Sequence, residues 1–307
     1  MEREKKNRAI GFVLAVWTGI LWGASSPIAQ YLFEHKEIQS SWLTPYRLLM
    51  SGILLLIYSA VRKKDILGVW KNRRDAVRLV IFGVVGMMGM QYSFFAAVQA
   101  TDAGTATFFQ YLNPAMLIVY YGVIKKKMPS RRELVAVVCA VSGIFLIATH
   151  GNLHGLSISP EGIGLGLLTA LTTCFYAVLP IALLEKYPSE VVCGWAMLIG
   201  GIVLSGVRKP WQMAVTVDKV VVVAFFTIVI MGTILPFCFY LAALPKIGAV
   251  YTGLMTSVEP VTATILAAVF LGTSFQSIDV VGFVLVLSTG FILNIKKRQK
   301  QTLEVTT

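Results

Sequence analysis

Glu259 has the most unusual position of any carboxylate in the sequence, because it lies well inside an apolar stretch and precedes Pro260. An ionisable side chain at such a place costs about 2.5 kcal/mol or more, so it usually faces a cavity or a polar partner. It could bind a cationic group or carry a proton. It could equally hydrogen-bond a neighbouring helix in its protonated form, and the sequence leaves both roles open.

Asn113 precedes Pro114 in the same way, so a neutral and an ionisable polar group occupy equivalent places in two apolar stretches. Asn113 could form the polar floor of a binding site. A hydrogen bond between helices, worth about 0.6 kcal/mol on average in a membrane, is the role that we favour for it.

Arg47 lies near the expected outer end of another apolar stretch. Its side chain could snorkel to the membrane interface or support the fold, and we favour these roles over bidentate binding of a carboxylate. We expect gating or structural roles for Arg47 and for four prolines within or beside apolar stretches: Pro27, Pro114, Pro180 and Pro260.

Polar and aromatic side chains at helical spacing could line a cavity. Ligand sites are mostly apolar and aromatic with a few directed polar groups, although a single aromatic residue in a membrane is more often structural. As a set these residues favour cavity lining: Trp22, Gln91, Tyr92, Phe95, Gln99, Gln110, Tyr111, Tyr176, Phe237, Tyr240 and Tyr251. Trp22 is the strongest single aromatic candidate, and with Asn113 and Glu259 the set would form a substrate site.

Other reactive arrangements find little support. The four cysteines lie singly in apolar runs, and His150 and His154 are separated by helix-breaking residues, which predicts a solvated loop and no metal site. The glycines of residues 162–166 follow no strand and precede no Gly-Lys-Ser/Thr, so an ATP-driven pump is not indicated. We expect no catalytic residue, no metal and no cofactor.

The composition indicates the kind of protein and the surroundings in which these residues lie. The chain has 307 residues, of which 56% are hydrophobic and 14% are charged. Soluble globular domains have roughly 25% charged residues. The surplus apolar surface must face lipid, which nearly excludes a water-soluble enzyme.

Ten apolar windows have about the length that crosses a bilayer. They cover residues 10–32, 42–60, 77–99, 103–124, 132–149, 161–183, 189–206, 217–242, 247–271 and 277–295. With a cytoplasmic N-terminus, 22 of the 27 Lys and Arg residues fall on the inner side. The positive-inside rule then places both termini in the cytoplasm of a multi-pass plasma or inner membrane protein, and the charge of +12 needs no nucleic acid to explain it.

Short patterns recur in the same order in two halves, 1–150 and 151–307. Pro27-Ile-Ala matches Pro180-Ile-Ala, Asn113-Pro114 matches Glu259-Pro260, and Gly143 matches Gly290. Because each half holds five spans, the second must enter the membrane from the opposite side. Such inverted repeats are frequent in secondary transporters, so we expect an all-α fold of two inverted five-helix repeats around a central cavity.

The sequence resembles the drug/metabolite transporter superfamily, and within it the ten-helix EamA type, over about residues 9–295. The resemblance rests on Trp22-Gly-x-Ser-x-Pro27, on Arg47, and on the x-Pro and Ser/Thr-Gly pairs of both halves. The family often has a glutamate in a Leu-Gly-Glu run, where this chain has lysines 125–127 and Leu271-Gly-Thr273.

The resemblance implies a secondary transporter of small metabolites, most plausibly an exporter of amino acids or related compounds. A multidrug or cation efflux protein and an importer of the same fold are alternatives, and an intramembrane enzyme for lipid-linked substrates is a remote one. The expected partners are a small-molecule substrate, membrane lipids and a proton as coupling ion, with the oligomeric state left open.

Overall fold

The computed structural model describes residues 2–113, 115–118, 128–150 and 157–304. Within these ranges the chain forms helices, turns and connecting segments, and no strand. Eight helical stretches in the described part are long and apolar enough to cross a membrane. The expected tenth span contains a shorter apolar stretch, Ser277–Ile292, and the expected fourth runs into residues outside the description.

The helices of the first half are α1 (Glu2–His35), α2 (Ser40–Val61), α3 (Arg73–Ile81), α4 (Gly89–Ala100), α5 (Ala103–Gln110) and α7 (Arg131–Thr149). A short 3₁₀-helix, Gly68–Lys71, precedes α3, and a π-helical segment, Phe82–Met88, joins α3 to α4. The third expected span is therefore one continuous helical element with a widened turn in the middle.

The helices of the second half are α8 (Pro160–Val178), α9 (Ile181–Leu184), α10 (Ser189–Arg208), α11 (Lys219–Val229), α12 (Leu235–Thr256), α13 (Val258–Leu271) and α14 (Ser277–Glu304). A 3₁₀-helix, Pro210–Gln212, follows α10, and a second π-helical segment, Ile230–Ile234, joins α11 to α12. Helix α12 continues across residues 243–246, where the sequence predicts a connection between spans.

The two π-helical segments occupy equivalent places in the third long helix of each half. Widened turns of this kind occur frequently at functional sites. Each π-helical segment packs against another helix at a glycine. A Cβ on Gly83 would lie 3.1 Å from the Ala196 carbonyl oxygen of α10. A Cβ on Gly232 would lie 2.5 Å from the Cβ of Ser25 of α1. The glycines therefore permit close packing where the backbone is irregular.

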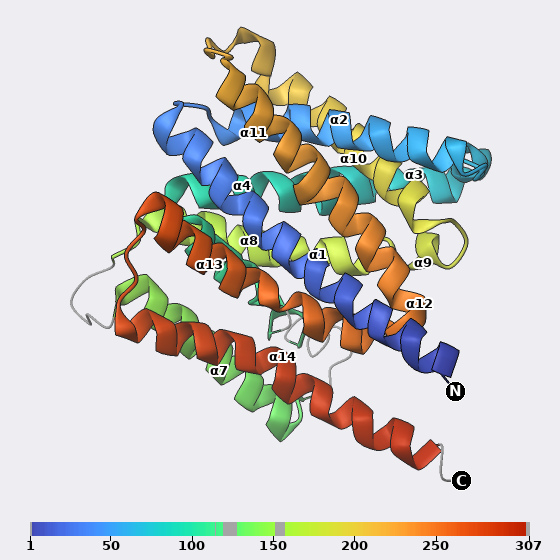
Figure 1. The fold of residues 1–307 in the computed structure, drawn as a ribbon, viewed down its shortest axis with the longest axis vertical. Helices are drawn as coiled ribbons and strands as arrows, with labels where there is room; N and C mark the ends of the chain where they lie inside the picture. Colours follow the sequence, from blue (N-terminus) through green and yellow to red (C-terminus); the bar gives the residue numbers. More distant parts are fainter. Residues whose placement is uncertain (1, 114, 119–127, 151–156, 305–307) are drawn as a thin grey trace.

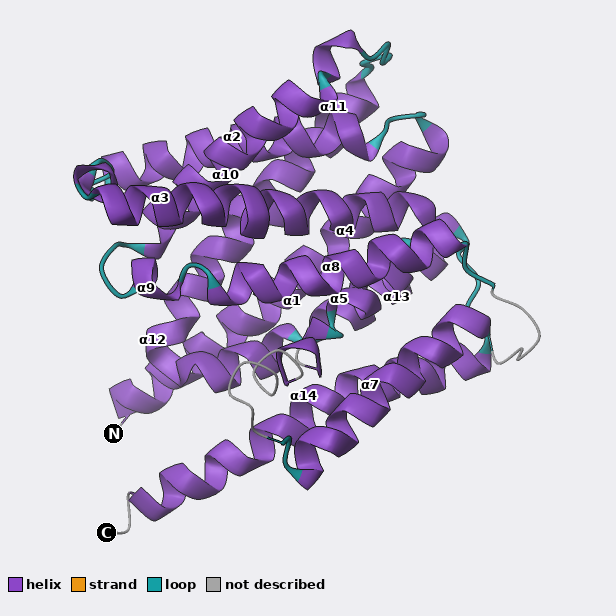
Figure 2. Cartoon of the chain, turned by 180° about the vertical axis from the view of Figure 1, so that it is seen from behind, coloured by secondary structure: helices purple, strands orange, loops and turns teal. Residues whose placement is uncertain are grey.

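Helix packing divides the described chain into a main bundle and a separate pair of helices. In the bundle α1 packs on α12 and α13, α2 packs on α10, and α4 packs on α8. Helices α7 and α14 pack on each other beside this bundle (Figures 1 and 2). A Cβ at either Gly143 or Gly282 would lie 2.7 Å from the carbonyl oxygen of the other, so Gly143 packs against Gly282 across this pair.

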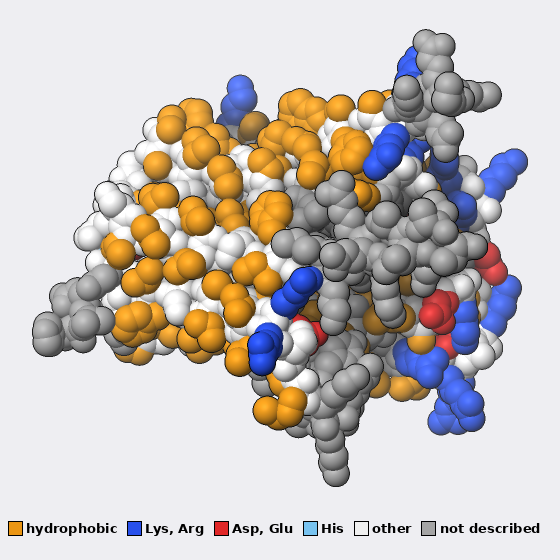
Figure 3. Space-filling view, turned by 90° about the horizontal axis from the view of Figure 1, so that it is seen from below, with side chains coloured by type: hydrophobic (Ala, Val, Ile, Leu, Met, Phe, Trp, Pro, Cys, Tyr) orange, Lys and Arg blue, Asp and Glu red, His pale blue; other side chains and the backbone are white. Residues whose placement is uncertain are grey.

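The outer surface suits a lipid environment. Large apolar side chains such as Trp17, Val207 and Phe270 are 50%, 69% and 75% exposed. In Figure 3 hydrophobic side chains spread over the left and upper part of the visible face, whereas most Lys and Arg side chains gather on the right, at the end where Figure 1 places the N-terminus. The protein is an integral membrane protein in which one end of the bundle is strongly basic.

Candidate functional site

Glu259 lies at a break in a membrane span. Helix α12 ends at Thr256, Ser257 forms a turn, and α13 begins at Val258, all within the apolar stretch Tyr251–Leu271. Pro260 therefore stands in the first turn of α13, where its missing N–H costs no helical hydrogen bond. The sequence predicts Glu259 beside a proline inside a span; the structure adds that the helix is interrupted before it.

The equivalent place in the first half is also interrupted. Helix α5 ends at Gln110, and Tyr111 and Leu112 form a turn before helical residue Asn113. Pro114 lies outside the described residues. In many transporters substrate and ion sites are formed by such discontinuous helices near the middle of the membrane.

A tyrosine joins the two breaks. The Tyr111 hydroxyl lies 3.3 Å from Glu259 Oε2 and 3.3 Å from the Thr256 carbonyl oxygen, and it can donate its proton to either. Both Tyr111 and Glu259 are half-buried. These contacts bring the Glu259 carboxyl, the Tyr111 hydroxyl and the Thr256 backbone carbonyl together where the two halves of the chain meet.

Two glycines of α1 hold this junction in place. A Cβ at Gly19 would lie 2.7 Å from the Thr256 carbonyl oxygen, and a Cβ at Gly23 would collide with the Glu259 carbonyl oxygen. Glycine four residues apart lets helix backbones approach closely in membranes. The Gly-x-x-x-Gly spacing of residues 19–23 is the sequence signal that marks this pair.

Aromatic rings cluster on the same stretch of α1. The Trp22 ring centroid lies 5.8 Å from that of Phe237 and 5.8 Å from that of Tyr240, both on α12. The ring centroid of Tyr176 on α8 lies 5.8 Å from that of Phe82, and Tyr176 packs against the same apolar cluster as Trp22. These side chains supply flat apolar surface and hydroxyl groups, which suit a site for a small organic molecule.

Arg47 is in the interior of the bundle and does not snorkel. It is only 6% exposed. Its Nε donates to Thr233 Oγ1 at 3.0 Å, Nη1 to Gln91 Oε1 at 2.9 Å and Nη2 to the Gly232 carbonyl oxygen at 3.2 Å. The expected snorkelling is wrong, because Thr233 and Gly232 of the π-helical segment and Gln91 supply acceptors that hold the guanidinium inside the protein, as the alternative role in supporting the fold requires.

The polar and aromatic side chains that were expected to line one cavity along the third span therefore lie in different environments. Phe95 is fully buried beneath the Arg47 guanidinium, which lies 4.6 Å from its ring centroid. Gln99 accepts a hydrogen bond from the Ser40 backbone at 2.9 Å, near the end of the bundle. Gln110 is half-buried at the end of α5, and the Asn113 carbonyl oxygen accepts from the Cys174 thiol at 3.4 Å.

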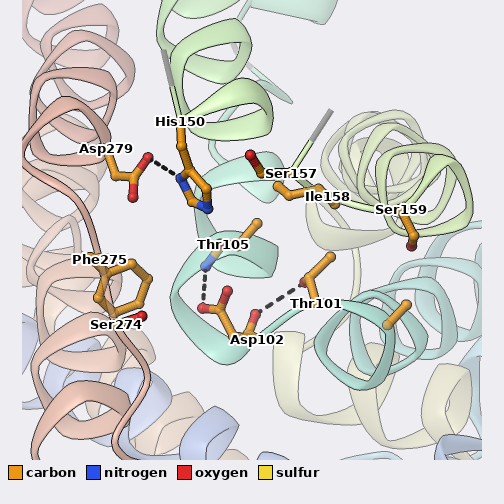
Figure 4. A pocket seen from close by; sticks show the side chains of 11 residues that line it. Thr101, Asp102, Thr105, His150, Ser157, Ile158, Ser159, Ser274, Phe275 and Asp279 are labelled. Carbon is orange, nitrogen blue, oxygen red and sulfur yellow. Dashed lines mark hydrogen bonds and ion pairs between the residues drawn. The ribbon is translucent and has the colours of Figure 1, made fainter. Parts of the chain in front are cut away.

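A polar hollow lies where α7 ends and α5 and α14 begin, on the side of the molecule away from the N-terminus in Figure 1, and Figure 4 shows its lining. It has a volume of about 220 Å³ and is lined by side chains that include Asp102, His150 and Asp279. His150 forms the turn after α7, its side chain is 31% exposed, and its Nδ1 lies 2.6 Å from Asp279 Oδ1. Asp102 accepts from the Thr105 backbone, and burial raises the pKa of its carboxyl. His154 lies outside the described residues.

Among the described residues, Glu259, Arg47 and His150 form no hydrogen bond with one another. The Glu259 carboxylate accepts from the Tyr111 hydroxyl, and the Arg47 guanidinium donates to neutral acceptors. His150 Nδ1 lies within hydrogen-bond distance of Asp279. In the described chain no group of three or more His, Cys, Asp or Glu side chains could hold a metal ion.

Comparisons with known proteins place this arrangement in a family. The EamA-like transporter family model matches residues 9–149 and again residues 160–295. The chain is 32% identical over 290 residues to the uncharacterized inner membrane transporter YicL of Salmonella typhimurium, covering 94% of this chain and 97% of the relative.

More distant relatives and a solved structure agree. The threonine/homoserine exporter RhtA of Escherichia coli K12 is 24% identical, covering 95% of this chain and 93% of RhtA. A solved structure superposes with a TM-score of 0.61 at 16% identity, over 96% of this chain and 98% of the other, which shows a shared fold. The two matches of the family model cover most of the sequence, and the chain belongs to the EamA-like transporter family.

Proposed function

We propose that this protein is a secondary transporter whose substrate binds where the two broken helices meet, at Tyr111 and Glu259. The observation that carries the proposal is the hydrogen bond between these side chains, which joins an interrupted helix of one half to that of the other. Substrate bound there would contact both halves at once. Rocking of one half against the other would then expose the same site to either side of the membrane in turn.

The substrate is a small metabolite with an amino group, most plausibly an amino acid or a derivative, and it moves outward. A carboxylate beside aromatic rings suits an ammonium group, because the acid supplies charge and the rings of Trp22, Tyr176 and Tyr240 supply cation–π contacts. Gln110 and Asn113 flank the break at Tyr111 and complete the site, whereas Gln91 and Phe95 hold Arg47 in place. The printed name of RhtA supports amino-acid export, at low identity.

Efflux of cationic amphiphiles is the second candidate. Glu259 with the Trp22, Phe237 and Tyr240 rings offers a larger apolar surface than a small amino acid needs. Growth assays with toxic amino-acid analogues and with cationic dyes separate the two, because overproduction should protect against only one class.

The basic end of the bundle supports an orientation with both termini in the cytoplasm, and Glu259 is the group that could couple transport to protons. The coupling model requires that proton binding and substrate binding compete for the same carboxylate. Transport by Glu259→Gln that equals wild type at every pH would contradict that role.

Untargeted mass spectrometry of medium and cytosol tests the proposed function. Cells that overproduce wild type should enrich one class of solute outside, and cells with Glu259→Gln should not. Glu161→Gln is the matched control, because Glu161 is exposed in the first turn of α8. No outward change with well-produced wild type would contradict export.

A further inference from the structure

Two ion pairs that link the halves occupy equivalent positions in the repeat. Lys36 follows the first helix of the first half and binds Asp218, which caps the third long helix of the second half, at 2.6 Å. Lys186 follows the first long helix of the second half and binds Asp75, in the first turn of the third long helix of the first half, at 3.0 Å. Each pair is the counterpart of the other.

The two pairs lie at opposite ends of the bundle. In Figure 1 the start of α3 and the end of α9 lie on the right, near the N-terminus, whereas the end of α1 and the start of α11 lie on the left. Each pair is therefore the link between the halves at one face of the membrane protein.

Aromatic contacts stand beside each pair in the same repeated manner. Trp42 at the start of α2 lies 6.2 Å from Phe225 of α11, in the ring-centroid distance. Its counterpart Trp195 in α10 lies 5.2 Å from Trp70 and donates to the Ile66 carbonyl oxygen at 2.7 Å. The two halves thus contact each other at both ends through an ion pair and an aromatic pair.

We propose that Lys36–Asp218 and Lys186–Asp75 are two equivalent latches, and that each closes one face of the protein during alternating access. The inference rests on the proposed transport function. A transporter that moves between two mirror-related states must break and reform contacts at its two faces in turn. An exposed ion pair such as Lys36–Asp218 suits this task because its net free energy is small and it can be exchanged for hydration.

The latches differ in strength. Asp75 is 2% exposed and also accepts a hydrogen bond from the Tyr187 hydroxyl at 3.0 Å, whereas the side chains of Lys36 and Asp218 are 25% and 40% exposed. Loss of a partner costs more when the remaining charge is buried. The face with Asp75 should therefore be the more firmly closed of the two.

Hydrogen exchange of the purified full-length protein, followed by mass spectrometry without substrate, tests the latches. Asp218→Asn keeps a capping oxygen on α11 but removes the charge, and it should speed exchange at the Lys36 face while slowing it at the Asp75 face. Asp75→Asn should give the reverse pattern. We expect roughly two- to five-fold changes in exchange rate, larger for Asp75→Asn.

Lys186→Gln provides a second way to open the Asp75 latch if Asp75→Asn fails to fold. Glu161→Gln is the matched control, because it removes one exposed carboxylate that belongs to neither latch. Faster exchange that stays at the altered end, with no protection gained at the other, would overturn the proposal. Reciprocal changes in hydrogen exchange without transport of any solute would instead contradict the proposed function but not the role of the two ion pairs.

Discussion

At the scale of single residues, the Tyr111 hydroxyl is the group that the structure adds to Glu259. Tyr111→Phe removes one hydrogen bond and keeps the ring, so it should lower the free energy of unfolding by about 0.5–1.5 kcal/mol. It should nevertheless impair transport strongly, because Glu259 loses the group that orients it. Thermal unfolding in detergent and transport in cells are the two measurements, and equal transport would show that Tyr111 does not position the acid.

The interior place of Arg47 leads to a different prediction at the same scale. Arg47→Ala should destabilise the protein by about 3 kcal/mol or more, because it leaves buried groups on Gln91, Thr233 and Gly232 without their donor. Arg47→Lys should recover only part of this, since one ammonium cannot reach three acceptors in a fork. A stable Arg47→Ala protein with no transport would contradict the structural role and indicate contact with substrate.

At the scale of helices, close packing of α1 on the break at Ser257 decides where Glu259 lies. Gly23→Ala should cost about 1–3 kcal/mol and impair transport, because the added Cβ meets the backbone of Glu259. Gly164→Ala is the control: nothing lies within 4 Å of its added Cβ, and the change should be neutral or stabilising by up to about 1 kcal/mol. Thermal unfolding checks both, and equal effects would contradict the packing account.

The positions of most long helices could be predicted from the sequence, because hydropathy indicates directly which stretches can cross a membrane. Eight of the ten apolar windows correspond, in the described part of the chain, to helices long enough to cross a membrane, and the repeated x-Pro pairs predicted equivalent places for Asn113 and Glu259. Periodicity could not predict that the helices break at Tyr111 and Ser257, since both turns lie in continuous apolar stretches. Nor could it predict that Arg47 is buried, because its acceptors include a carbonyl freed by a π-helical segment far along the chain.

At the scale of the whole molecule, the latch at the Lys36 face should not respond to physiological pH. The hydrogen bond from Lys36 holds the pKa of the Asp218 carboxyl below its usual value, and the same bond raises the pKa of Lys36. The stabilisation from Asp218 is present above its unfolded pKa and is lost only as pH falls through the lower folded value.

Wild type and Asp218→Asn should therefore show the same relative pH dependence of transport between about pH 5 and 8. Any pH dependence in that range must come from another group, and the residual transport of Glu259→Gln should lack it if Glu259 carries the proton. A pH profile that flattens in Asp218→Asn but not in Glu259→Gln would contradict this division of roles.

Substrate exchange in proteoliposomes tests most directly whether Glu259 and Tyr111 form the substrate site. Exchange of labelled for unlabelled substrate at equal pH on both sides needs binding and alternating access but no net proton movement, so it separates binding from coupling. With the solute identified by metabolite profiling, wild type and Glu161→Gln should exchange it at similar rates, while Glu259→Gln and Tyr111→Phe should lose most of the exchange. Exchange by Glu259→Gln with wild-type rate and affinity would contradict the site.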